Sequence, residues 1–137
     1  MGLNKCDLTG LTILVVEDDV DARELVEFWL HACGATVHAA DSAGAALTLL
    51  GAHTPDVMVS DIAMPDHDGY ELVRIVRSLR DPEKRRVPAI AVTAHTGEHD
   101  KARAFEAGFD AHLAKPVHPD VLAQAVSRLA RDVQRLN

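Results

Sequence analysis

The chain has 137 residues, of which 47% are hydrophobic, and its formal net charge is -7. This length is typical of one domain with a single core. The acidic balance argues against a protein that holds nucleic acid by its phosphates, because such proteins carry a basic face. The sequence has no run of about 18 apolar residues, so we expect no membrane span.

The first ten residues are mixed and polar, and they lack the apolar stretch of a signal peptide. We expect a flexible lead-in or the end of a linker over residues 1–10, followed by one folded domain over residues 11–134. Cys6 and Cys33 are far apart and show no metal-binding spacing. They predict a reduced pair in a cytoplasmic protein, and argue against a disulfide or a zinc site.

Short apolar runs, typical of buried parallel strands, alternate with segments of helical spacing along the chain. Strands are predicted over residues 11–16, 36–39, 56–60, 88–93 and 111–114. Apolar residues at helical spacing predict helices over residues 22–30, 43–50, 72–79, 98–107 and 119–136. Five strands alternating with five helices predict an α/β domain, with a parallel sheet covered on both faces.

Short polar side chains at the predicted helix starts are typical N-caps, since they accept from free backbone N–H groups. Asp19 or Asp21 is expected to cap the first helix, and Asp41 or Ser42 the second. Residues 81–86 combine acidic and basic side chains without aromatic ones, which predicts a solvated turn and not a nucleic-acid patch.

Polar side chains stand at the ends of four predicted strands. They are, in chain order, Glu17 and Asp18, Asp61, Thr93 and Lys115. The carboxyl ends of parallel strands line the crevice where ligands bind, so we expect these side chains to converge on one edge of the sheet. Each alone would suggest a helix cap or a solvated turn, but the combination favours one shared site.

This set of side chains suits phosphoryl transfer. A carboxylate such as Asp61 can attack phosphorus and form an aspartyl phosphate. The phosphoryl group and three carboxylates would repel one another, and a Mg²⁺ ion together with Lys115 would offset that charge. Lys115 can pair with one phosphoryl oxygen and the Thr93 hydroxyl can donate to another, which is most of what this reaction requires of a protein.

Mg²⁺ prefers an octahedron of oxygen ligands that includes one or two carboxylates. We expect Asp18 and Asp61 to bind it directly, with the backbone carbonyl of Ala63 as a third ligand. Glu17 is expected to act through a bound water.

The segments VVEDD, SDIAMPDHDGYEL, PAIAVTAH and GFDAHLAKPV resemble the receiver domain of two-component response regulators. The resemblance covers roughly residues 11–129 and is closest to receiver domains attached to hybrid sensor histidine kinases. It implies a five-stranded flavodoxin-like fold with strand order 2-1-3-4-5. It also implies phosphorelay signalling, in which a histidine kinase or a histidine phosphotransfer protein phosphorylates Asp61 in the presence of Mg²⁺.

The resemblance further implies a signalling module that is not an enzyme, although it catalyses its own phosphorylation and dephosphorylation. Thr93 takes the place of the switch hydroxyl, and the Lys115–Pro116 peptide is expected to be cis. One departure is His112, where the family often has Tyr or Phe; it affects the aromatic switch and not the phosphorylation chemistry. Output is expected through protein contact, phosphate relay or other domains, with no direct contact to nucleic acid or membrane.

Four alternative interpretations are less well supported. An aspartate-nucleophile phosphatase would want a second acid where Ala63 stands, and a flavodoxin would want a phosphate-binding loop where the acidic EDDVDA segment stands. His95 and His99 have i, i+4 spacing, but Gly97 between them predicts a loop and not a metal site. A phosphorylation-independent interaction module would share the fold but would normally lack one of the key residues.

Overall fold

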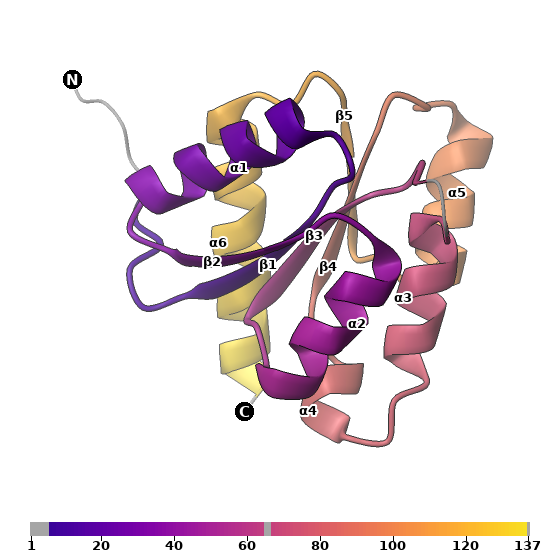
Figure 1. Ribbon diagram of the computed structural model, residues 1–137, viewed down its shortest axis with the longest axis horizontal. Coiled ribbons are helices and arrows are strands. Elements are labelled where there is room, and N and C mark those ends of the chain that lie inside the picture. The colour runs from indigo at the N-terminus through magenta and orange to yellow at the C-terminus, as the bar shows by residue number, and fades with distance from the viewer. Residues whose placement is uncertain (1–5, 65–66, 137) are drawn as a thin grey trace.

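The computed structural model describes residues 6–64 and 67–136, and within them the chain forms one parallel sheet flanked by helices (Figure 1). The strand order is β2-β1-β3-β4-β5, which confirms the predicted flavodoxin-like topology. Pro65 and Asp66, which belong to the predicted loop after β3, lie outside the described residues, as does the first half of the predicted lead-in. The strands are β1 (Thr12–Val16), β2 (Thr36–Ala40), β3 (Val57–Asp61), β4 (Ala89–Thr93) and β5 (Ala111–Ala114).

The helices cover both faces of the sheet, with α1 and α6 on one face and α2, α3 and α5 on the other (Figure 1). Among the described residues, we find no helix with the length and apolar character that a membrane crossing requires. The helices are α1 (Val20–Ala32), α2 (Ala43–Ala52), α3 (Gly69–Arg77), α4 (Pro82–Arg85), α5 (Glu98–Ala107) and α6 (Pro119–Leu136).

The alternation of side chains along β1 explains why the strands read as continuous apolar runs. Ile13 is buried in the core beneath α1 and α6, whereas Leu14 is buried in the core beneath α2, α3 and α5. A parallel sheet buried on both faces requires apolar side chains in both directions.

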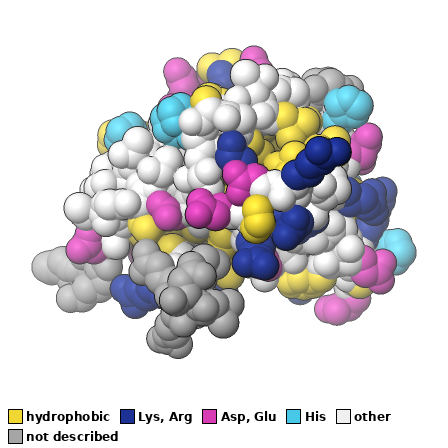
Figure 2. All heavy atoms as spheres, turned by 90° about the horizontal axis from the view of Figure 1, so that it is seen from below, with side chains coloured by type: hydrophobic (Ala, Val, Ile, Leu, Met, Phe, Trp, Pro, Cys, Tyr) yellow, Lys and Arg dark blue, Asp and Glu magenta, His cyan; other side chains and the backbone are white. Residues whose placement is uncertain are grey.

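The short helix α4 corrects one prediction, because residues 81–86 were expected to form a charged turn. Asp81 caps this helix by accepting from Glu83 N at 2.9 Å, and Pro82 occupies its first turn, where a missing N–H costs nothing. Seen from this end of the molecule, Figure 2 shows Lys and Arg side chains gathered together with acidic ones. Two caps were predicted for each of α1 and α2. In α1 the cap is Asp19, which accepts from Ala22 N, and in α2 it is Ser42, which accepts from Ala45 N.

The two cysteines form a disulfide, so the prediction of a reduced pair was wrong. The sequence separation of 27 between Cys6 and Cys33 says nothing about their distance in space. Cys33 ends α1, and the backbone of Leu8 returns to it, with Leu8 N donating to Cys33 O at 2.8 Å. The Cα atoms of the two cysteines are 5.3 Å apart, inside the usual range for a disulfide of about 4.4–6.8 Å. Leu8 is only 1% exposed, so this part of the predicted lead-in packs on the domain.

Arg77, at the end of α3, joins two segments, one between α4 and β4 and the other between α5 and β5, at the amino ends of these strands. Its guanidinium donates to the carbonyl oxygens of Gly108, Arg85 and Val87 at 3.0, 2.9 and 2.7 Å. It also donates to Asp110 Oδ2 at 3.0 Å, and that oxygen accepts from the backbone N–H of the first residue of β4. Burial lowers the pKa of Arg77, and the carboxylate of Asp110 opposes that effect.

Candidate functional site at the carboxyl edge of the sheet

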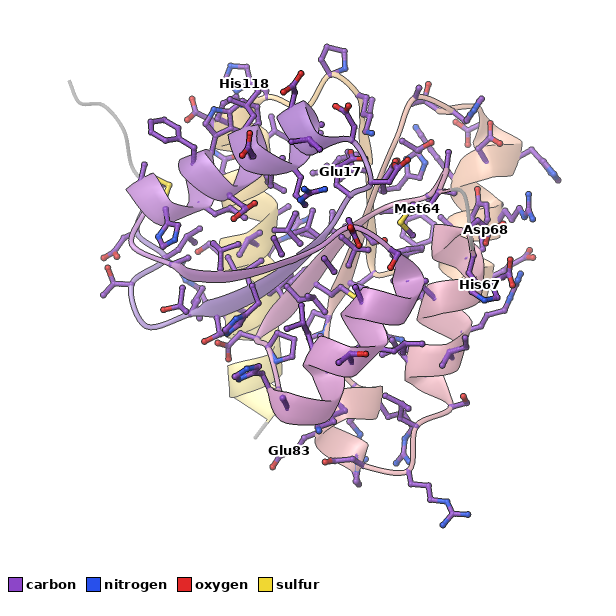
Figure 3. All side chains as sticks on the ribbon, viewed as in Figure 1. Glu17, Met64, His67, Asp68, Glu83 and His118 are labelled. Atoms are coloured by element: carbon purple, nitrogen blue, oxygen red, sulfur yellow. A yellow bond between two sulfur atoms is a disulfide. The ribbon has the colours of Figure 1, made fainter. Side chains whose placement is uncertain are left out.

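Three carboxylates come together where β1 and β3 end. Glu17 and Asp18 follow β1, and Asp61 is the last residue of β3. Because Val16 pairs with Ser60 in the sheet, these acids lie beside each other, with one carboxylate oxygen of each within 4.8 Å of the others. Figure 3 shows Glu17 at this edge of the sheet and Glu83 at the opposite end of the molecule.

The three acids differ in exposure. Asp61 and Glu17 are 7% and 6% exposed, whereas Asp18 is exposed to solvent. Hard divalent cations bind oxygen ligands and often retain several waters. A cluster of two buried carboxylates and one open to solvent can therefore hold such a cation at the surface.

Lys115 supplies the positive charge of this cluster. Its Nζ lies 2.8 Å from Glu17 Oε1 and 3.2 Å from Asp61 Oδ1. Burial is the largest single influence and by itself lowers the pKa of Lys115, but the hydrogen bond with Glu17 and the charges of Asp61 and Glu17 outweigh it and raise the pKa. Lys115 is therefore held as an ammonium next to both carboxylates.

The backbone around Lys115 fixes where its side chain begins. Lys115 N donates to Thr93 O at 2.9 Å, which continues the pairing of β4 with β5 by one residue. The Lys115–Pro116 peptide is cis, as the resemblance implied.

The backbone at the end of β3 lies close against the start of α3. Asp61 Oδ1 accepts from Ile62 N at 2.9 Å, and Gly69 N donates to Ile62 O at 2.7 Å. A Cβ atom at Gly69 would lie 2.5 Å from Asp61 O and 2.8 Å from Ile62 Cα, so only glycine permits this approach. The sequence analysis did not single out Gly69 as part of the site.

Thr93 and His112 lie on the sheet face that α5 covers. Thr93, the last residue of β4, is 2% exposed, and its hydroxyl accepts from His95 N at 3.0 Å. His112 pairs in register with Ala91, a member of the core beneath α2, α3 and α5. Among the described residues, His112 Nε2 is buried and has no hydrogen-bond partner.

The remaining candidate residues lie around this cluster. Ala63 is exposed, two residues after β3, and its carbonyl as a metal ligand stays a prediction. Asp19 caps α1, as one of the two predicted caps, and is not one of the three clustered acids. Within residues 6–64 and 67–136, no group of three or more potential metal ligands includes His95 or His99.

A groove opens from the site and runs between α1 and the segment from β5 to α6, with a volume of about 480 Å³. The helical spacing of Trp29 and its neighbours predicted a helix but no groove, because such spacing does not distinguish a core face from a groove wall. Besides apolar residues of the strands, the groove is lined by Ala22, Leu25, Val26, Trp29, Pro116, Val117 and Leu122, and at the site by Glu17, Asp19, Asp61 and Lys115.

Comparison with known proteins agrees with this geometry. The sequence pattern that defines the response regulator receiver domain matches residues 13–127, so the chain belongs to this family of two-component signalling domains. The "Uncharacterized 14.6 kDa protein in sodA1 3'region" of Leptolyngbya boryana is 45% identical over 121 residues, which cover 88% of this chain and 91% of that protein.

Two further similarities concern proteins of known class. Regulator of RpoS from Escherichia coli K12 is 38% identical over 80% of this chain, and the match spans about a third of that longer protein (32%). The crystal structure of the signal receiver domain of a signal transduction histidine kinase from Syntrophus aciditrophicus has a TM-score of 0.83 and 32% identity. That match covers 92% of this chain and 94% of the solved domain.

Proposed function

We propose that Asp61 accepts a phosphoryl group from a phosphohistidine of a histidine kinase or a histidine phosphotransfer protein, with Mg²⁺ bound. The observation that carries this proposal is the position of Lys115, whose ammonium contacts the carboxylates of Asp61 and Glu17 beside the exposed Asp18. One cation is thus already placed against the acceptor, as transfer of an anionic group requires.

The donor set fits Mg²⁺, because this ion takes oxygen ligands and commonly one or two carboxylates with waters. Asp18 and Asp61 would bind it directly with the Ala63 carbonyl, and Glu17 through a water while it keeps its contact with Lys115. The bound ion would supply charge neutralisation and hold phosphoryl oxygens in place.

In the transfer step, a carboxylate oxygen of Asp61 forms a bond to phosphorus while the bond from phosphorus to the donor's imidazole nitrogen breaks. The electron pair of that bond leaves with the imidazole. Lys115 pairs with one phosphoryl oxygen. Thr93 accepts from His95 N, so the proton of its own hydroxyl is available to donate to another phosphoryl oxygen.

We further propose that Thr93 and His112 transmit the effect of phosphorylation at Asp61 to the face of the sheet that α5 covers. Movement of the Thr93 hydroxyl towards the phosphoryl group would free space on the face covered by α5. The imidazole of His112 lies on the same face, and its buried Nε2 has no hydrogen-bond partner among residues 6–64 and 67–136. A rearrangement that provides a partner would therefore be favoured. This gives His112 the place that an aromatic residue holds in many relatives.

The proposed acceptor is tested by incubating the protein with acetyl phosphate and Mg²⁺ and measuring its intact mass. We expect one added phosphoryl group in the wild type and in Asp41→Asn, which changes an exposed acid after β2, and none in Asp61→Asn. An unchanged yield in Asp61→Asn would exclude Asp61 as acceptor. A wild type that accepts no phosphoryl group, from acetyl phosphate or from any purified histidine kinase, would favour a phosphorylation-independent interaction module.

A further inference from the structure

The groove beside the acceptor is apolar along its length and polar only at the site. At one end its wall is formed by Asp61 and Lys115. Away from that end it is lined by Val26 and Trp29 of α1, and by Leu122 of α6. A ligand with an anionic head and an apolar body would find matching surroundings for both parts.

The size of the groove suits a small molecule. Its volume of about 480 Å³ lies within the range of about 300–1,000 Å³ that is usual for small-molecule sites. Such sites combine apolar walls with a few polar groups that orient the ligand, and here the orienting groups are those that bind the phosphoryl group in the proposed function.

We propose that the groove binds the apolar acyl group of an acyl phosphate, so that the protein accepts phosphoryl groups from aromatic acyl phosphates in preference to acetyl phosphate. This inference rests on the proposed function of Asp61. A carboxylate oxygen of Asp61 forms the bond to phosphorus, and the bond between phosphorus and the acyl oxygen breaks. The electron pair leaves with that oxygen, so the acyl group departs as a carboxylate and no proton is needed.

Benzoyl phosphate and acetyl phosphate form a matched pair of donors, since their carboxylate leaving groups are of similar basicity. Burial of a phenyl ring in the groove should make phosphorylation of Asp61 by benzoyl phosphate roughly tenfold faster at equal low concentration. Leu25→Ala removes part of the groove wall and should reduce the ratio of the benzoyl phosphate rate to the acetyl phosphate rate to about threefold. Phe28→Ala is the control, because Phe28 is 68% exposed on the same helix and does not line the groove.

Binding can be measured without transfer, because Trp29 lines the groove and is the single tryptophan of the chain. Phenylphosphonate cannot transfer its phosphoryl group, and in Mg²⁺ it should change the emission of Trp29 at concentrations where methylphosphonate does not. Equal rates from the two donors with no response of Trp29 would overturn the groove inference and leave Asp61 as acceptor. Failure of both donors to phosphorylate Asp61 would overturn the proposed function and this inference with it.

Discussion

Lys115 Nζ lies 2.8 Å from Glu17 Oε1, although the two residues are 98 positions apart. The ion pair joins the end of β1 to the turn after β5, and these strands are separated in the sheet by β3 and β4. The contact thus spans the proposed acceptor Asp61, which lies at the end of β3.

Removal of the ammonium should separate metal binding from phosphoryl transfer. In Lys115→Met we expect phosphorylation of Asp61 to slow by roughly a hundredfold, because no fixed cation meets the phosphoryl group. The affinity for Mg²⁺ should stay the same or rise, since a neighbouring positive charge is gone. Mass spectrometry and titration calorimetry measure the two effects. Lys84→Met, which removes a hydrogen bond to Gly51 O far from the site, is the control and should change neither.

The raised pKa of Lys115 predicts the pH dependence of its contribution to stability. A group whose pKa is higher in the folded state stabilises the fold fully below its unfolded pKa, and this contribution is lost as pH rises through the folded pKa. The ordinary value is 10.5 and the folded one lies above it. The difference in unfolding free energy between wild type and Lys115→Met should therefore be constant from about pH 7 to about pH 9 and decline only above about pH 10.5. A decline near neutrality would show that Lys115 is not held as an ammonium.

Asp18 and Asp19 are adjacent but should differ in their effect on the metal. Asp18 belongs to the acidic cluster, whereas Asp19 caps α1. Asp18→Asn should weaken Mg²⁺ binding by at least about tenfold. Asp19→Asn should weaken it by less than about threefold and leave the cap intact, because Asn is as good an N-cap as Asp. Titration calorimetry compares the two, and equal losses would place the metal elsewhere.

Arg77 should contribute strongly to stability. Arg77→Met leaves the carbonyl oxygens of Gly108, Arg85 and Val87 without this donor, and it unpairs Asp110. We expect the free energy of unfolding to fall by about 2–4 kcal/mol. Arg74→Met, at an exposed position of the same helix, should change it by less than about 0.5 kcal/mol. Urea unfolding followed by circular dichroism measures both.

The disulfide should stabilise the domain without taking part in phosphorylation. Cys6 and Cys33 enclose β1 and α1 in a covalent loop. Cys33→Ser, or reduction of the wild type, should lower the unfolding free energy by about 2–4 kcal/mol. Phosphorylation of Asp61 by acetyl phosphate at a temperature where the variant is folded should proceed at the wild-type rate. A thermal midpoint that reductant does not change would show that the bridge does not form.

Within the part of the chain that the structure describes, the buried Nε2 of His112 has no hydrogen-bond partner, and replacing the imidazole by an apolar ring should be stabilising. His112→Phe keeps a ring and removes the unpaired Nε2, so the unfolding free energy should rise by about 1 kcal/mol. His112→Ala should lower it, because a buried ring is lost. If His112→Phe is instead destabilising, the imidazole has a partner that matters to the fold. Amide shifts on α5 and β5 with and without phosphorylation would then report its part in the switch.

The strands and the site residues at their ends could be predicted from sequence, because four of the five apolar runs end on or are followed by a chemically distinct residue such as Asp61 or Thr93. The parallel topology then requires these residues to meet at one edge. Helix α4 could have been found from Asp81 and Pro82, which form an N-cap followed by a first-turn proline. The charged side chains of residues 83–86 are equally typical of a solvated turn, so their composition does not predict the helix.

Other features depend on how distant segments pack, and no local pattern contains them. The disulfide forms only because residues 6–8 return to the end of α1, and its presence removes the reduced cysteine pair as an argument for the cytoplasm. The role of Arg77 depends on three carbonyl groups that face it from two loops. An arginine at the end of an amphipathic helix predicts a solvated side chain equally well.

The position of the Arg77 cluster has a mechanical consequence. Arg77 and Asp110 fix β4 and β5 where these strands begin, whereas Thr93 and Lys115 lie where they end. The two strands are therefore fixed by side chains where they begin, whereas Thr93 and Lys115, where they end, belong to the proposed site. A displacement of Thr93 should be felt in the loop that leads to α5, because the Thr93 hydroxyl accepts from His95 N in that loop, while the register of β4 with β5 at Asp110 stays unchanged.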